Sequence, residues 1–203
     1  GYSVSGLAQG QQLLGWYVLS DTLRDDAHAA LAALRQQGIQ PMMLTGDHPQ
    51  AAQAIAGQLG LSDWQAQQRP QDKANWVAAQ RAAGKLVGMV GDGVNDAPAL
   101  AGADVSFAIG GGSDAAMATA DITIKQAHLL ALLNVIALSR ATLGKIRQNL
   151  FFAFIYNLLG IPLAALGLLN PVLAGAAMAL SSVSVVSNSL LLRNWKAPFG
   201  AQR

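Results

Sequence analysis

The residues best suited to chemistry lie in one short segment, Gly91-Asp92-Gly93-Val94-Asn95-Asp96-Ala97-Pro98. It follows the apolar run Lys85–Val90, which predicts a buried strand, and it opens a short helix at Ala97-Pro98. Two carboxylates and an amide are then expected at a strand's carboxyl end, where open α/β sheets bind ligands. The two glycines allow a sharp turn and close approach to a ligand. A few hard oxygen donors suit Mg²⁺, whereas the plainer alternative is a solvated Asx-rich turn.

Two other positions point to a phosphate. Thr45 and Gly46 follow the apolar run Ile39–Leu44 and precede a helix, so backbone N–H groups and a hydroxyl are expected to face an anion. Lys73 stands at another helix start, where its amine can reach a phosphate as a point charge. Each position alone is weak, because Thr-Gly-Asp is a common turn and a lone helix lysine is usually solvated. Their order along the chain is far more specific.

The elements that must position these residues alternate between strand and helix, which predicts an α/β fold with a parallel sheet and right-handed crossovers. Glycine stops end the expected helices at Gly38, Gly60 and Gly84. The expected helices cover residues 25–37, 49–59 and 72–83, and the expected strands cover residues 13–20, 39–44, 85–90, 105–109 and 121–124. An amphipathic helix is expected over residues 127–146.

Charge divides the chain in two. All eleven acidic residues are Asp, and the last is Asp121, whereas residues 122–203 carry seven Lys or Arg. Most of this basic excess flanks apolar segments and is not interleaved with aromatic residues, which argues against nucleic-acid binding. The chain has no Cys, so it offers no thiolate metal ligand.

Residues 148–192 contain no Asp, Glu, Lys, Arg or His, which predicts a membrane-embedded tail. Two helices fit, over residues 150–169 and 172–192, and each is long enough to cross the hydrocarbon core. Asn170-Pro171 between them predicts an antiparallel hairpin. A buried hairpin of a soluble protein is the alternative. The turn has no basic residue, so both ends of the hairpin are expected in the cytoplasm, flanked by Arg140, Lys145, Arg147, Arg193, Lys196 and Arg203.

Polar side chains inside these helices are candidates for an ion path. Met178 and Ser182 are four residues apart and share one helix face. Tyr156 and Asn157 lie about one turn before Pro162, which frees a backbone carbonyl. A thioether with oxygen donors suits Cu(I) better than Zn²⁺, for which an intramembrane Asp or Lys would be expected. Close helix packing through small residues is the alternative.

At this point the chain resembles a known family. The segments that resemble the haloacid-dehalogenase-type (Rossmann-like) phosphorylation domain of P-type ATPases are Met43-Leu44-Thr45-Gly46-Asp47, Pro70-Gln71-Asp72-Lys73 and residues 90–100. Three further segments resemble the last two membrane helices of the heavy-metal branch, the copper(I) exporters: residues 147–150, Tyr156-Asn157 and residues 178–182. The resemblance covers residues 13–196, and the chain departs from it at Ser106, Ser113 and Met117.

The resemblance implies a role for each matched residue. Thr45, Gly46 and Asp47 would contact the phosphoryl group or nucleotide, Lys73 would neutralise the phosphoaspartate and also face the nucleotide, and Asp21 would help to orient the nucleotide. Asp92 would bind Mg²⁺, with Asn95 and Asp96 supporting phosphate and metal. The implied copper ligands are Tyr156, Asn157, Met178 and Ser182.

The resemblance also implies a function, namely ATP-driven export of copper(I) across a bilayer, expected to be the bacterial plasma membrane, with Mg²⁺ as cofactor and a copper chaperone as a source of the ion. The γ-phosphate would pass to an Asp within Asp-Lys-Thr-Gly-Thr. No Asp here is followed by Lys-Thr-Gly, so the chain is expected to be the C-terminal part of a larger pump and inactive alone. Asp21 is a rival nucleophile, but it lacks a second Asp two residues later. Two different functions also fit these residues, namely a zinc/cadmium pump and a non-catalytic remnant that binds metal.

The expected organisation has five parts. They are the tail of a nucleotide-binding region (residues 1–12), the phosphorylation domain (13–126), a connecting helix (127–147), a transmembrane helix pair (148–196) and a cytoplasmic tail (197–203).

Overall fold

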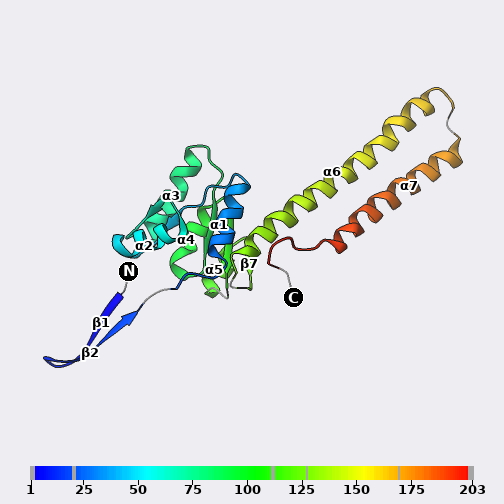
Figure 1. Ribbon diagram of the computed structural model, residues 1–203. Helices are drawn as coiled ribbons and strands as arrows, with labels where there is room; N and C mark the ends of the chain where they lie inside the picture. Colours follow the sequence, from blue (N-terminus) through cyan, green and yellow to red (C-terminus); the bar gives the residue numbers. More distant parts are fainter. Residues whose placement is uncertain (1–2, 20–21, 111–112, 127, 169, 201–203) are drawn as a thin grey trace. The chain divides into compact units, whose positions relative to one another are not determined.

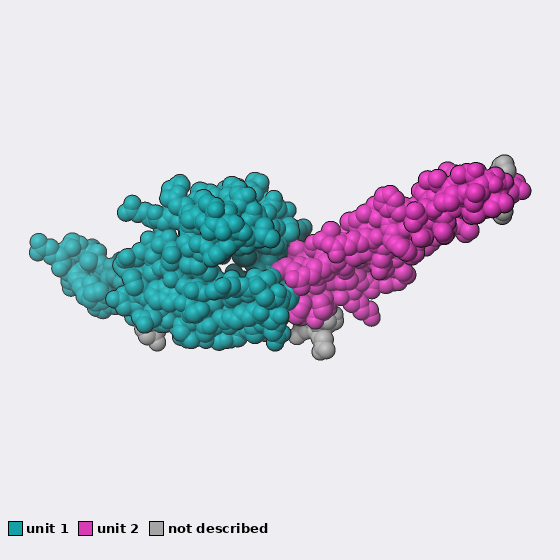
Figure 2. Space-filling model, turned by 90° about the horizontal axis from the view of Figure 1, so that it is seen from above, with its two compact units in different colours: residues 1–133 teal, residues 134–203 magenta. Residues whose placement is uncertain are grey.

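The structure is a computed structural model that describes residues 3–19, 22–110, 113–126, 128–168 and 170–200. The chain divides into two compact units, Gly1–Leu133 and Asn134–Arg203, which are coloured separately in Figure 2. The candidate nucleotide residue Asp21 lies outside the described residues.

The first unit alternates strands and helices, as the sequence predicts (Figure 1). Its elements are β1 (Ser3–Gln9), β2 (Gln12–Leu19), α1 (Ala27–Gln36), β3 (Met43–Leu44), α2 (Pro49–Leu59), β4 (Trp64–Gln65), α3 (Pro70–Ala82), β5 (Gly88–Gly91), η1 (Val94–Asp96), α4 (Ala97–Gly102), β6 (Val105–Ile109), α5 (Asp114–Thr119) and β7 (Ile122–Ile124).

The predicted parallel sheet is confirmed, in two pieces. Strands β5, β6 and β7 form a three-stranded parallel sheet in that order, and β3 pairs in parallel with β4. Strand β6 lies in the centre, and four of its five residues are buried. Its Ala108 forms a core cluster with Leu100 and Ala116, and Met89 and Met117 pack against this cluster. These two methionines therefore serve packing.

Two strand expectations were wrong. Strand β5 was expected to be buried, but its residues alternate between exposed and half-buried. The reason is that β5 forms the edge of its sheet among the described strands. Strand β2 does not join a parallel sheet; it pairs antiparallel with β1 in a hairpin. The weakly alternating residues 3–9 gave no clear strand signal. The domain boundary after residue 12 lies at this hairpin and stays a prediction.

Turn chemistry explains the helix ends beside the candidate site. Helix α2 begins with Pro49, whose fixed φ suits the first helical position, and ends at Gly60, whose φ is +60°. Helix α3 likewise begins with Pro70, and its Asp72 accepts a hydrogen bond from the Arg69 N–H at 3.0 Å. This arrangement places Lys73 in the first turn of α3.

The second unit is a long antiparallel helical hairpin, to which η2 (Leu191–Asn194) adds one turn. Helix α6 (Leu130–Ala165) is one span long and apolar enough to cross a membrane, with a mean hydropathy of 1.3. The second span, Ala174–Asn194, covers most of helix α7 (Pro171–Leu190) and η2, with a mean hydropathy of 1.5. Neither apolar window is buried within the described part of the chain, whereas the core helix of a soluble domain is mostly buried.

The expected connecting helix and the expected first membrane helix are parts of one continuous helix, α6, and the domain division at residue 147 stays a prediction. No proline lies between residues 130 and 161, and Pro162 sits inside the helix. The helix ends at Ala165, and Gly167, whose φ is +71°, follows two residues later. There the Leu168 N–H donates to the Leu163 carbonyl at 2.9 Å and the Gly167 N–H to the Ala164 carbonyl at 3.0 Å, the pattern of a Schellman cap.

Candidate phosphoryl-transfer site

The candidate site is built on the loop that follows β5. This strand ends at Gly91, the chain turns through Asp92 and Gly93, and η1 leads into α4. A Cβ atom at Gly91 would lie 2.6 Å from the Cβ and 2.9 Å from a carboxylate oxygen of Asp96. Glycine at this position therefore lets the Asp96 side chain fold back over the strand end.

Lys73 and Asp96 form an enclosed ion pair. The Lys73 Nζ donates to the Asp96 Oδ1 at 2.8 Å, and the two side chains are 14% and 13% exposed. Helix α3 supplies the lysine, and the loop after β5 supplies the carboxylate. The structure thus brings together two residues that the sequence identifies as candidates, 23 positions apart.

Asp92 remains open to solvent. Its side chain is 66% exposed, and the Arg24 guanidinium lies 3.9 Å from one carboxylate oxygen. The Asp92 carbonyl accepts a hydrogen bond from the Ser113 N–H at 3.0 Å, which fixes the backbone at the start of α5. Arg24 is therefore a further candidate for the site, which sequence reasoning missed although it ends the segment Asp21-Thr22-Leu23-Arg24.

The donor set suits a magnesium ion that keeps waters and phosphate oxygens as ligands. Mg²⁺ is commonly held by one or two protein carboxylates together with a substrate phosphate. Asp92 offers one exposed carboxylate, whereas Asp96 is engaged with Lys73. Within the described parts of the chain, no three His, Cys, Asp or Glu side chains gather into a group that could enclose a metal.

Thr45 is less available to an anion than the sequence suggests. Its N–H donates to the Gln65 carbonyl at 3.0 Å, and its hydroxyl donates to the Asp47 carboxylate at 2.7 Å. The Asp47 N–H in turn donates to the Thr45 hydroxyl at 3.1 Å. The expectation of a free Thr45 N–H was therefore wrong, because pairing between β3 and β4 uses it.

Carboxylates stabilise the strands beside the loop. Asp121 accepts hydrogen bonds from the Ser106 hydroxyl at 2.8 Å and from its N–H at 2.9 Å, and these bonds lower the pKa of Asp121. The N–H of Val87 donates to Asp104, and this bond, together with Arg81, lowers the pKa of Asp104. Both carboxyls are therefore held in the charged form at neutral pH.

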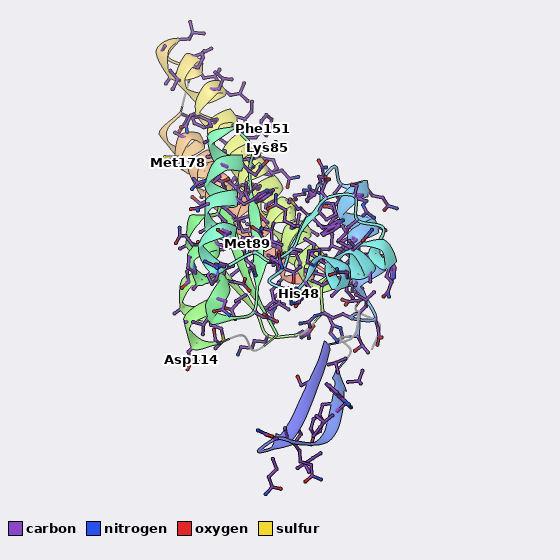
Figure 3. All side chains as sticks on the ribbon, turned by 90° about the vertical axis from the view of Figure 1, so that its left-hand side faces the viewer. His48, Lys85, Met89, Asp114, Phe151 and Met178 are labelled. Carbon is purple, nitrogen blue, oxygen red and sulfur yellow. The ribbon has the colours of Figure 1, made fainter. Side chains whose placement is uncertain are left out.

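The four candidate ion ligands do not form a closed cluster in the hairpin. Met178 is 73% exposed on α7 (Figure 3), and the Ser182 hydroxyl donates to the Met178 carbonyl at 3.2 Å. Asn157 donates within α6 to the Ala153 carbonyl at 2.9 Å. Tyr156 is half-buried. Pro162 has no N–H, so the Leu158 carbonyl lacks its usual helical donor.

Comparison with known proteins gives one consistent result. Residues 5–104 match the haloacid dehalogenase-like hydrolases. The chain is 53% identical over 194 residues to the probable copper-importing P-type ATPase A of Enterococcus hirae, covering 95% of this chain and 27% of that protein. It is 50% identical over 190 residues to the copper-exporting P-type ATPase of Staphylococcus aureus, covering 94% of this chain and 24% of that protein.

A solved structure of a P-type ATPase also matches this chain. The crystal structure of a zinc-transporting PIB-type ATPase in the E2.Pi state has a TM-score of 0.83 and 39% identity, and the match covers 95% of this chain and 32% of that one. The chain thus spans about a quarter of the length of the curated relatives it matches.

Proposed function

The chain belongs to the heavy-metal P-type ATPases, and on that premise we propose that it is the C-terminal part of an ATP-driven copper(I) pump. One observation carries the proposal: the Lys73–Asp96 pair beside the Asp92 loop and an apolar hairpin with Met178 and Ser182 occur in a single chain. A phosphoryl site and a soft-ion path in one polypeptide are what such a pump needs.

Each side chain of the first unit has a proposed part in phosphoryl transfer. Asp92 would hold Mg²⁺, which would offset the charge of the phosphate oxygens. Lys73 brings a positive charge to the acyl phosphate, and Asp96 orients Lys73 and would support the metal. Asn95 offers its amide to phosphate. ATP and the phosphoryl group are contacted further by Asp21, Thr45, Gly46 and Asp47.

The acceptor of the phosphoryl group is proposed to come from another segment of the pump. Strands β3 and β5 are both edge strands among those described, and the Thr45 and Asp92 loops follow their carboxyl ends. A further parallel strand pairing with either edge would end beside the corresponding loop. An Asp after that strand, within Asp-Lys-Thr-Gly-Thr, would then face Lys73 or Thr45. This supports an aspartyl-phosphate mechanism shared between segments.

Copper(I) is the proposed ion because of the donors on α6 and α7. The thioether of Met178 is a soft ligand, and Tyr156, Asn157 and Ser182 add oxygens nearby along the helices. Zinc is the second candidate, because the matched crystal structure is of a zinc-transporting ATPase. However, residues 148–192 contain none of the charged residues that would offset a divalent ion.

The proposed location is the bacterial plasma membrane, with the first unit and residues 197–203 in the cytoplasm, since the basic residues flank the outer ends of the hairpin. Delivery of copper(I) by a chaperone and export from the cell complete the proposal. The relatives include one named as an importer and others named as exporters, so the direction of transport must be measured. Uptake of copper into inverted vesicles measures it. Accumulation in the presence of ATP is expected for an exporter.

The test uses the complete pump, including the segment with the acceptor Asp. We expect copper(I) to stimulate ATP hydrolysis and to raise the level of a phosphoenzyme that hydroxylamine cleaves, as an acyl phosphate requires. Stimulation by Zn²⁺ alone would contradict the choice of copper. If the complete natural protein lacks Asp-Lys-Thr-Gly-Thr, the proposed ATPase activity is contradicted and a metal-binding remnant is favoured.

A further inference from the structure

A network of hydrogen bonds joins the two membrane helices near one end of the hairpin. The Lys145 Nζ donates to the Asn188 Oδ1, the Asn188 Nδ2 donates to the Asn149 Oδ1, and the Asn149 Nδ2 donates to the Ser189 hydroxyl, each at 2.8 Å. The Ser189 hydroxyl donates to the Val185 carbonyl, also at 2.8 Å. The network thus crosses between α6 and α7 three times. We call Lys145, Asn149, Asn188 and Ser189 the polar lock.

The lock accounts for two amides in a segment otherwise dominated by apolar residues. Residues 148–192 contain four asparagines, and a buried amide without partners is costly away from water. Asn170 caps α7 by accepting from the Val172 N–H at 2.9 Å. Asn157 bonds within its own helix. Asn149 and Asn188 alone bond across the hairpin among these four, so their contacts depend on how the helices are aligned lengthwise.

The alignment fixed by the lock sets the depth of the candidate ion ligands. Asn149 and Ser189 are hydrogen-bonded across the hairpin. Tyr156 is seven residues beyond Asn149 on α6, and Ser182 is seven residues before Ser189 on α7. Seven residues are two helical turns, about 10 Å, and return to nearly the same face. Because the helices are antiparallel, Tyr156 and Ser182 then lie at one depth.

The same alignment of the two helices also sets the depth of Met178. It lies four residues, or about 6 Å, beyond Ser182 on α7, which places it level with Gly160 of α6. A Cβ atom added at Gly160 would meet no atom within 4 Å, so α6 leaves open space for a thioether and an ion at this depth. A slip of α7 by one turn would instead bring Met178 level with Tyr156 and would move Ser182 out of reach.

We propose that the polar lock is a set of positioning residues that hold the candidate ligands of α6 and α7 at matching depths for a soft monovalent cation. This inference rests on the proposed function. The lock touches no ion itself; it acts by fixing the lengthwise register of two helices. Interhelical hydrogen bonds suit this task because apolar side chains facing lipid give little preference for one register over another.

The test measures metal dependence in the complete pump carrying Asn149→Ser or Ser189→Asn. We expect each variant to need roughly tenfold more copper(I) for half-maximal ATP hydrolysis, the size of effect typical of residues that orient metal ligands. The KM for ATP and phosphorylation by inorganic phosphate in the absence of metal should stay unchanged. The double variant Asn149→Ser/Ser189→Asn exchanges the two partners and should restore the copper dependence.

A matched control and the contradicting outcomes complete the design. Ser184 also donates within α7, to the Leu180 carbonyl at 2.7 Å, and lies outside the lock. Ser184→Ala should therefore leave the copper dependence unchanged. Single variants with parental copper dependence, or a folded exchange variant as impaired as the single ones, would overturn the register inference. If the single variants do not fold, the exchange variant decides. A parent pump that copper(I) does not stimulate would instead refute the proposed function.

Discussion

The Lys73 ammonium and the Asp96 carboxylate meet at 2.8 Å, and each side chain is about seven-eighths enclosed by protein. This contact ties the first turn of α3 to the loop after β5. A charge enclosed to this degree is costly when its partner is removed.

Lys73→Ala should destabilise the chain by about 1–3 kcal/mol, because Asp96 would keep its burial and lose its partner. Urea unfolding in detergent, followed by tryptophan fluorescence, measures the change. Lys85→Ala is the matched control, since Lys85 is exposed and bonds to Gln80 on the surface. The control should lie within about 0.5 kcal/mol of the parent. Equal effects from both variants would contradict the structural role of the ion pair.

Gly91→Ala should disrupt the site, because a Cβ atom there would lie 2.6 Å from the Cβ of Asp96. We expect phosphoenzyme formation in the complete pump to fall by tenfold or more, roughly 1.4 kcal/mol in the barrier. Gly93→Ala is a close control, since its nearest contact would be 3.8 Å away. The two variants lie in the same loop, so a larger loss at Gly93 would show that this geometry is wrong.

Asp92→Asn should abolish magnesium-dependent turnover of the complete pump with folding intact. The exposed carboxylate is the proposed ligand, and an amide oxygen lacks the charge that Mg²⁺ requires. ATP hydrolysis is measured across a magnesium titration, and the melting temperature reports the fold. Undiminished activity at low magnesium would remove Asp92 from the metal site.

Ser106→Ala should destabilise the first unit at neutral pH but have a diminishing effect in acid. The Ser106 hydroxyl and N–H lower the pKa of Asp121 below its ordinary value of 3.8. A lowered pKa contributes stability that is present above the ordinary value and is lost as the pH falls through the folded value. The unfolding free energies of parent and variant should therefore converge below about pH 4.

The control for this profile is Ser62→Ala, which removes an exposed hydroxyl 3.3 Å from the neighbouring Asp63. Its difference from the parent should be small at every pH. A Ser106→Ala effect that does not depend on pH would mean that lost packing, and not the charge of Asp121, is responsible.

Asp26→Ala should lower the free energy of unfolding by about 0.5–2 kcal/mol, the usual range for a lost helix cap. The Asp26 carboxylate accepts from the Leu130 N–H at 2.9 Å, so it caps the start of α6 although it belongs to the segment before α1. Its side chain is 10% exposed, whereas Asp25 is exposed. Asp25→Ala is therefore the comparison in thermal unfolding, and a larger loss at Asp25 would contradict the capping role.

Local signals predicted the helices of the first unit well. Pro49 and Gly60 delimit α2, because proline favours the first helical position and glycine the left-handed end. Strand neighbours were harder to predict, because pairing depends on residues far away along the chain. The apolar run 85–90 resembles a central strand, but β5 lies at an edge of the described sheet.

In the candidate site too, residue types could be predicted from the sequence, whereas long-range contacts could not. The types and order of Thr45, Lys73 and Asp92 indicate phosphate chemistry from the sequence alone. The contact between Lys73 and Asp96 could not be predicted, since it joins residues 23 positions apart. Asn149 and Asn188 carry no local signal at all, because their contact joins two helices 39 positions apart.

Helix α6 has a mechanical consequence. Its 36 residues extend about 54 Å, whereas the hydrocarbon core of a bilayer is about 30 Å thick. Roughly four turns of the same helix must therefore lie outside the hydrocarbon core, and the helix is unbroken between the two parts. A displacement of the part of α6 outside the membrane is therefore transmitted along the unbroken helix to Tyr156. Helix α6 can bend at its ends and at Pro162, which follows the candidate ligands Tyr156 and Asn157 along the helix.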